Sequence, residues 1–139
     1  MRVVLDPNVI ISALLSPDGA PARTLRAWLQ GHFELVASPL LLEELARALA
    51  YPKLRKLIEP QEGDRVIEWL RSASMAADPE GAPPIRSPDR GDDYLIALAE
   101  AERAVLASGD QHLLGLAEDL PIYSPVGFLG LLEEQGDKP

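Results

Sequence analysis

Two aspartates that each follow a short apolar run are the residues of this sequence best placed to do chemistry. Asp6 comes directly after the apolar run 3–5, and Asp110 follows the run 104–107 by way of Ser-Gly. A short apolar run that ends abruptly in polar residues predicts a buried strand whose end delivers a side chain to a loop. We therefore expect both carboxylates at the end of a strand.

Two further acidic positions belong to predicted helices. Glu44 lies in a helix that begins directly after a strand, and Asp92 or Asp93 begins another helix. In parallel α/β sheets, ligands bind where the carboxyl ends of strands meet the amino ends of helices. We therefore expect Asp6, Glu44, Asp92 and Asp110 to lie at the same edge of one sheet.

The chemistry of such a cluster points to a divalent cation. Carboxylates within ~5 Å repel one another by roughly 3 kcal/mol per pair at an effective dielectric of about 20. The cluster is stable near neutral pH only if some groups take up protons or a cation enters. Mg²⁺ and Mn²⁺ prefer oxygen ligands of this kind. Taken singly, each acidic residue also has an ordinary structural role, as a turn residue, a solvated helix surface or a helix N-cap.

The elements that must position these residues alternate between strands and helices. Apolar runs predict strands over 3–5, 33–37, 104–107 and 121–123. Apolar periodicity predicts helices over 9–15, 21–30, 39–51, 61–73, 92–102, 112–116 and 126–134. Short, continuously apolar strands between helices are typical of an α/β fold with a parallel sheet. The segment 78–89 carries four prolines and a glycine, and we interpret it as a long loop.

Composition narrows the class of protein. The 139 residues, 47% of them hydrophobic, fit one domain spanning 1–139. The absence of cysteine excludes disulfides and thiolate metal sites, and no run of 18 apolar residues occurs, so we expect a cytoplasmic protein with no membrane association. The net charge of −9 is unusual for a nucleic-acid enzyme, because such enzymes use Lys and Arg to neutralise phosphates.

Four segments together resemble the PIN (PilT N-terminus) domain family. They are V-V-L-D-P-N-V-I-I-S-A-L-L at 3–15, S-P-L-L-L-E-E-L-A-R-A-L at 38–49, D-R-G-D-D-Y-L-I-A-L-A at 89–99 and V-L-A-S-G-D-Q-H-L-L at 105–114. No single segment is specific, but the four occur in the family's order and with family-like spacing. The resemblance covers roughly residues 2–130. Pro7 and Ser87 depart from it, since the family usually has Thr or Ser at the first position and often Asp at the second.

The resemblance implies a three-layer α/β/α sandwich with a central, mostly parallel sheet of four or five strands. It also implies an endonuclease, a metal-dependent ribonuclease that hydrolyses RNA phosphodiester bonds with one or two Mg²⁺ or Mn²⁺ ions. The second motif selects Glu44 over Glu43. The eighteen-residue spacing to Asp110 selects Asp92, with Asp93 as the second choice. The implied catalytic and metal-binding residues are Asp6, Glu44, Asp92 and Asp110, with Asp93 as an additional metal ligand.

Other implied roles surround these carboxylates. Asn8, Ser108 and Asp89 are expected to hold them in place, although Asn8 also reads as a helix N-cap. Asp89 is typical of a subgroup of proposed toxins of toxin–antitoxin systems, the VapC-like ribonucleases. The expected partners are therefore RNA, an antitoxin protein and a second copy of the chain. The cations considered for RNA contact are Arg23, Arg26, Lys53, Arg55, Lys56, Arg86, Arg90 and Arg103, with Arg86 and Arg90 preferred.

Three other classes of protein also gather carboxylates or share this fold. A PIN-fold module that binds protein or RNA with little or no catalysis agrees with the net charge of −9 and stays open. A phosphoacceptor receiver needs a Lys on a late strand, and neither 104–107 nor 121–123 contains one. A haloacid-dehalogenase-type phosphatase needs Asp-x-Asp where this chain has Asp6-Pro7-Asn8. The last two are set aside.

Overall fold

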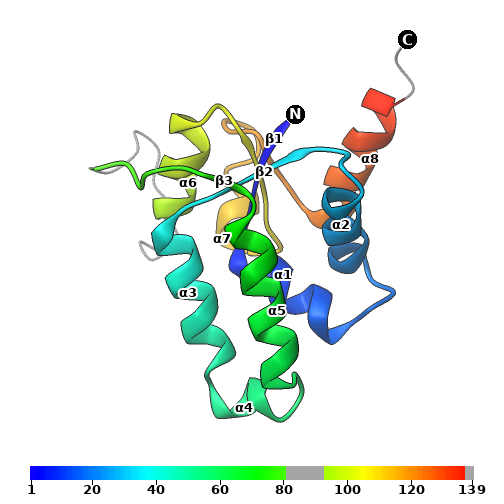
Figure 1. The fold of residues 1–139 in the computed structure, drawn as a ribbon. Helices are drawn as coiled ribbons and strands as arrows, with labels where there is room; N and C mark the ends of the chain where they lie inside the picture. The colour runs from blue at the N-terminus through cyan, green and yellow to red at the C-terminus, as the bar shows by residue number, and fades with distance from the viewer. Residues whose placement is uncertain (81–92, 137–139) are drawn as a thin grey trace.

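The computed structural model describes residues 1–80 and 93–136, and the fold is a single parallel sheet covered by helices on both faces (Figure 1). The strands are β1 (Arg2–Leu5), β2 (Glu34–Ala37), β3 (Ser74–Met75), β4 (Val105–Ala107) and β5 (Ile122–Tyr123). The helices are α1 (Pro7–Leu15), α2 (Ala20–Leu29), α3 (Pro39–Leu49), α4 (Pro52–Arg55), α5 (Pro60–Arg71), α6 (Asp93–Ala101), α7 (Gln111–Leu114) and α8 (Pro125–Gly136).

Alternation along β1 divides the core into two layers. Val3 and Leu5 belong to one buried cluster and Val4 to the other, because successive side chains of a strand point to opposite faces of the sheet. The first cluster includes residues of α1, α3, α5 and α8, and the second includes residues of α6 and α7 together with Leu41 from the start of α3. The three-layer α/β/α arrangement predicted for this chain is therefore confirmed.

The sheet order is β3-β2-β1-β4-β5, with every pairing parallel. The chain leaves β1 toward β2 on one side, and it leaves β4 toward β5 on the other. The carboxyl ends of β1 and β4 are therefore the point where the connections diverge. In open α/β sheets this switch point is where a crevice for ligands forms.

The start of α3 is fixed by two side chains. The hydroxyl of Ser38 accepts a hydrogen bond from the Leu41 amide at 3.2 Å, and Pro39 occupies the first helical position. The carboxylate of Asp78 accepts a second bond, from the Leu40 amide at 2.9 Å. The two caps satisfy amides that have no partner within the helix. The Asp78 cap also attaches the segment after β3 to the amino end of α3.

Most predicted elements are confirmed, and three details differ. β3 was not predicted; it has two residues and forms only by pairing with Val36 and Ala37 of β2. A short helix, α4, lies between the helices predicted over 39–51 and 61–73. Asn8 does not cap α1, because Asp6 is the N-cap and accepts the Asn8 amide hydrogen bond. Of the predicted 78–89 loop, only the part up to residue 80 is described.

Over residues 1–80 and 93–136, the structure has no helix that combines the length and the apolar character needed to span a membrane.

Candidate functional site

Asp6 lies at the switch point of the sheet and is 2% exposed. The residue directly follows β1, and its backbone amide donates to the Ala107 carbonyl of β4 at 3.0 Å, which ties the two strand ends together. Its Oδ1 accepts a hydrogen bond from the Asn8 amide at 3.0 Å, and its Oδ2 accepts one from the Ser108 hydroxyl at 2.7 Å. Each carboxylate oxygen therefore has a donor that holds it in one orientation.

Ser108 links Asp6 to Asp110. Its fully buried hydroxyl donates to Asp6 and accepts a hydrogen bond from the Asp110 amide at 3.0 Å. A hydroxyl can do both at once because it carries one donor hydrogen and two acceptor lone pairs. Asp6 and Asp110, which follow separate strands, are therefore connected by hydrogen bonds to the same Ser108 hydroxyl.

Asp110 is more accessible than Asp6, with a quarter of its side chain exposed. The residue caps α7, and its Oδ1 accepts a hydrogen bond from the His112 amide at 2.7 Å. The His112 ring also lies close, with Nδ1 at 3.8 Å from the same oxygen. Asp110 thus fulfils the ordinary role of an N-cap and still presents a carboxylate beside Asp6.

Electrostatics distinguish the buried aspartate. Burial raises the pKa of the Asp6 carboxyl above its ordinary value of 3.8. The Asn8 amide and the Ser108 hydroxyl lower this pKa, and the negative charge of Asp110 raises it again. Burial and the charge of Asp110 therefore disfavour the ionised form of the Asp6 carboxyl, and a nearby cation would stabilise it.

A hollow of about 220 Å³ opens next to Asp110. It is lined by Asn8, Val9, Ser12, Pro21, Gly109, Asp110 and Pro125. Sequence reasoning did not identify Ser12, Pro21 or Pro125, because no acidic or basic group marks them and three separate helices bring them together. The hollow gives a ligand access to the accessible side of Asp110.

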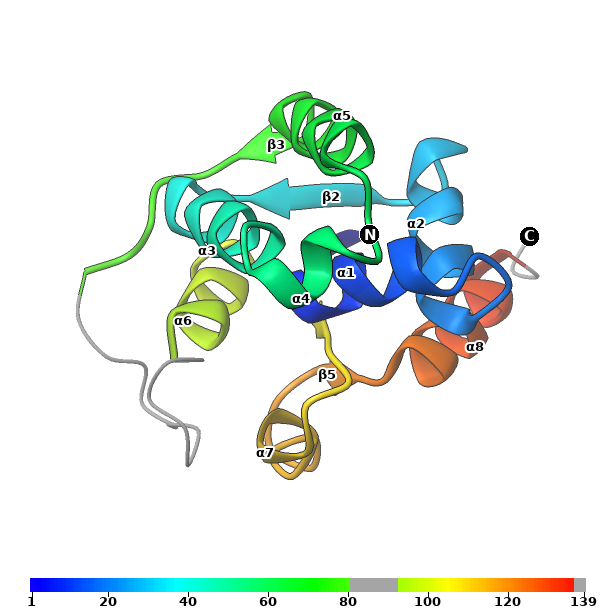
Figure 2. The same ribbon diagram turned by 90° about the horizontal axis from the view of Figure 1, so that it is seen from below.

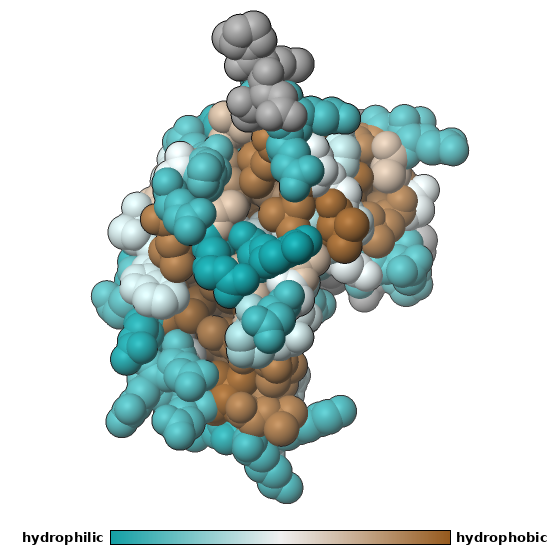
Figure 3. All heavy atoms as spheres, turned by 90° about the vertical axis from the view of Figure 1, so that its right-hand side faces the viewer, coloured by the Kyte–Doolittle hydropathy of each residue, from teal (hydrophilic) through white to brown (hydrophobic). Residues whose placement is uncertain are grey.

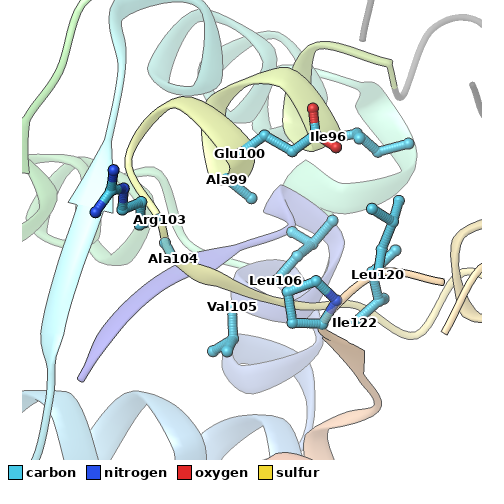
Figure 4. A pocket seen from close by; sticks show the side chains of 10 residues that line it. Ile96, Ala99, Glu100, Arg103, Ala104, Val105, Leu106, Leu120 and Ile122 are labelled. Atoms are coloured by element: carbon cyan, nitrogen blue, oxygen red, sulfur yellow. The ribbon is translucent and has the colours of Figure 1, made fainter. Parts of the chain in front are cut away.

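A larger hollow, of about 370 Å³, is apolar and does not include either aspartate (Figure 4). Ile96, Leu106, Leu120 and Ile122 surround it between α6 and the strands β4 and β5. We assign it no part in the site, since its lining offers few polar groups and neither Asp6 nor Asp110.

The structure does not bring the other predicted site residues into this hydrogen-bonded pair. Glu44 is on α3, and its carboxylate forms an ion pair with Arg47 one turn further on, with 37% of the side chain exposed. Asp93 is the first residue of α6 and is half-buried. Asp89, Asp92, Arg86 and Arg90 lie outside the described residues. Within the described residues, no three His, Asp or Glu side chains are grouped closely enough to hold a metal ion.

Comparison with known proteins agrees with this architecture. Residues 2–112 match the family described as the PIN domain. The uncharacterised protein MJ1680 of Methanocaldococcus jannaschii is 30% identical over 122 residues, which cover 86% of this chain and 77% of the relative.

Among solved structures, the crystal structure of FitAcB from Neisseria gonorrhoeae contains a chain with the same fold. The TM-score is 0.55 at 21% identity, over 89% of this chain and 98% of the other. The family match spans four of the five strands, and it includes Asp6, Ser108 and Asp110. The chain therefore belongs to the PIN domain family.

Proposed function

We propose that this protein is a divalent-metal-dependent ribonuclease that hydrolyses RNA phosphodiester bonds. The observation that carries the proposal is the linkage of Asp6 to Asp110 through Ser108 at the switch point of the sheet. PIN domains are generally nucleases, and this pair lies at the switch point, where open α/β sheets bind ligands.

The donor chemistry fits Mg²⁺ or Mn²⁺. Carboxylate oxygens are the ligands these ions prefer, and the raised pKa of Asp6 reflects a penalty that a bound cation removes. In this proposal Asp6, Asp92 and Asp110 hold one or two ions, with Glu44 and Asp93 as additional groups. A bound ion supplies attraction for the scissile phosphate, a more acidic water and stabilisation of the leaving oxygen.

The chain's own residues have separate tasks in the reaction. Ser108 and the Asn8 amide fix the orientation of the Asp6 carboxylate, so that its oxygens need not reorganise when charge develops. Asp89 is proposed to support the same set of carboxylates. Glu44 is proposed to orient or deprotonate the attacking water, and its Oε1 forms the ion pair with Arg47.

Two sets of residues are proposed to contact the substrate. The hollow beside Asp110 accommodates part of the RNA, because its lining combines the polar Asn8 and Ser12 with apolar proline rings. Arg86 and Arg90 are proposed to contact phosphates.

The toxin role rests on the sequence motifs of the subgroup described above. We propose that the protein acts in the cytoplasm as the toxin of a toxin–antitoxin pair and that an antitoxin protein binds it. A homodimer is proposed, with the exposed apolar side chains of Leu15, Leu29 and Val126, on α1, α2 and α8, as candidate contacts. Figure 3 shows apolar surface between hydrophilic residues on the side of the molecule where α2 and α8 lie in Figure 1.

An RNA cleavage assay tests the proposal. Purified protein should cut RNA in Mn²⁺ or Mg²⁺, and both EDTA and the D6N substitution should abolish the cutting. The matched control is D119N, which removes one carboxylate from an exposed position between α7 and β5. Cleavage that persists both in EDTA and in D6N would refute the proposal, because no carboxylate-held ion would then be required.

A second candidate is a PIN-fold module that binds protein or RNA without cutting. The net charge of −9 favours it. This candidate predicts that D92N leaves partner binding intact and that the wild-type protein cleaves no RNA under any metal condition. The ribonuclease proposal predicts that the wild-type protein cleaves RNA and that D92N does not.

A further inference from the structure

One segment of this acidic chain is strongly basic. Residues 45–58 contain four Lys or Arg and no Asp or Glu, so this segment carries +4 in a chain whose net charge is −9, and the remainder carries −13. Such a separation of charge within a small domain indicates a surface with an anionic partner.

The structure places three of these cations on one turn between helices. We call residues 51–57, which include α4, the basic tip; it carries Lys53, Arg55 and Lys56, all exposed. Two large side chains are exposed with them, Tyr51 at 57% and Leu57 at 65%. An aromatic ring next to several cations is the combination with which proteins bind single-stranded nucleic acid.

The cations of the basic tip are available for a partner. Within the described residues, Arg2, Arg47 and Arg71 pair with glutamates, whereas Lys53, Arg55 and Lys56 form no ion pair. Arg55 borders a small hollow together with Glu59 and Asp64 but lies beyond ion-pair distance of both.

The backbone of the basic tip is ordered by its apolar side. The Leu54 and Arg55 amides donate to the Tyr51 carbonyl at 3.0 Å, and the Ile58 amide donates to Leu54 at 2.8 Å. Ile58 is buried, and Leu54 packs against the same core cluster. The cations therefore project from a turn that is fixed to the core.

The basic tip projects on the side of the molecule where the candidate site lies. In Figure 1, β1 runs downward to α1, and α3 and α5 extend below the strands to α4 at the lowest point. In Figure 2, seen from that side, α4 lies in front of α1, whose N-cap is Asp6. A strand of nucleic acid that reaches the ends of β1 and β4 from this side has α4 beside its path.

We propose that the basic tip is a second RNA-binding surface, which holds the single-stranded substrate away from the cleaved bond. This inference builds on the proposed ribonuclease function and names a further part of its substrate contact. Lys53, Arg55 and Lys56 neutralise backbone phosphates, and the Tyr51 ring stacks on a base. Affinity gained at the basic tip also offsets the repulsion between RNA and the acidic remainder of the chain.

The test is RNA binding measured without cleavage. In a D6N background with Mg²⁺ present, fluorescence anisotropy of a labelled single-stranded RNA is recorded over a range of salt concentrations. The triple variant K53Q/R55Q/K56Q should bind more weakly, and the slope of log affinity against log salt should fall by about 2, since each single-strand phosphate contact contributes about 0.7. Y51A should weaken binding about tenfold and leave that slope unchanged.

The matched control removes three cations that are not among those considered for RNA contact. R2Q/R65Q/R71Q changes net charge by the same amount; within the described residues Arg65 forms no ion pair, and Arg2 and Arg71 pair with glutamates. Circular dichroism and thermal unfolding should show both triple variants folded. An equal loss of slope in the control would overturn the proposal, because charge alone would then explain it.

Two further outcomes also overturn it. One is that the chain with an intact basic tip does not bind RNA. The other is that the basic-tip variant shows an unchanged salt slope, which would indicate that the basic tip binds an acidic protein partner instead. RNA binding that depends on the basic tip but is accompanied by no cleavage would support this inference and contradict the ribonuclease. The two proposals therefore fail separately.

Discussion

Ser108 and Asp6 lie 102 residues apart in the chain, and the Ser108 hydroxyl donates a 2.7 Å hydrogen bond to Oδ2 of Asp6. Both side chains are buried, so this bond joins the ends of two neighbouring strands where water has no access. Its removal leaves a buried carboxylate oxygen without its donor.

S108A should therefore lower the free energy of unfolding by roughly 1–3 kcal/mol, the cost of leaving a buried polar group unsatisfied. Urea denaturation followed by circular dichroism measures this difference. The control S72A removes an exposed hydroxyl that bonds only to the Trp69 carbonyl, and it should change stability by no more than about 0.5 kcal/mol. Equal effects of the two substitutions would show that the bond to Asp6 contributes nothing particular.

The pH dependence of stability should identify the penalty on Asp6. Because the folded-state pKa of this carboxyl is raised above 3.8, the folded protein binds its proton more tightly than the unfolded chain does. The carboxyl therefore destabilises the fold increasingly as the pH rises from 3.8 through the folded-state pKa, and fully above it. D6N should be more stable than the wild type at neutral pH, and this advantage should disappear as the pH approaches 3.8.

Thermal unfolding of both proteins over this pH range, with D119N as the reference for an exposed aspartate, gives the comparison. A stability advantage of D6N that is independent of pH would mean that ionisation of Asp6 is not its cause.

Divalent cations should stabilise the folded chain through the same residues. A ligand that binds only the folded state at 100 times its dissociation constant adds about 2.7 kcal/mol. Mn²⁺ titration followed by differential scanning calorimetry should raise the melting temperature of the wild type. D6N and D110N should respond much less, whereas D119N should respond as the wild type does. A uniform response of all four proteins would place the ion elsewhere.

Asp78 should contribute to stability through the amino end of α3. D78A removes the acceptor of the Leu40 amide hydrogen bond, and the loss of an N-cap acceptor costs about 0.5–2 kcal/mol. D18A, which truncates an exposed aspartate in the turn before α2, is the control. Urea denaturation compares them, and a D78A protein as stable as the wild type would show that Ser38 alone is a sufficient cap.

The sequence predicted those parts of the fold that depend on local pattern. Val3–Leu5 reads as a buried strand because its apolar run ends at Asp6, and Ser38-Pro39 reads as a helix start because both residues favour that position. β3 escaped prediction because Ser74 and Met75 have no apolar pattern and extend only when β2 lies beside them. Its existence depends on tertiary pairing.

In the site, too, the features that depend on local pattern were predictable and the long-range contacts were not. The placement of Asp6 and Asp110 at neighbouring strand ends follows from parallel topology, and the structure agrees. The Ser108 bond that connects them depends on the register of β1 against β4, which periodicity does not specify. The pairing of Glu44 with Arg47 reflects a contact available to any helix with opposite charges three residues apart. The contribution of Asp78 to α3 spans 38 residues and has no local sequence signal.

The outer strands β3 and β5 have only two residues each. A strand edge this short presents few unpaired amides and carbonyls, so another chain gains little by extending the sheet. Self-assembly by strand addition is therefore disfavoured at both ends of the sheet. The helices, rather than the strand edges, are therefore the surfaces on which a specific oligomer of this protein is expected to form, because side-chain shape and charge there can select the partner.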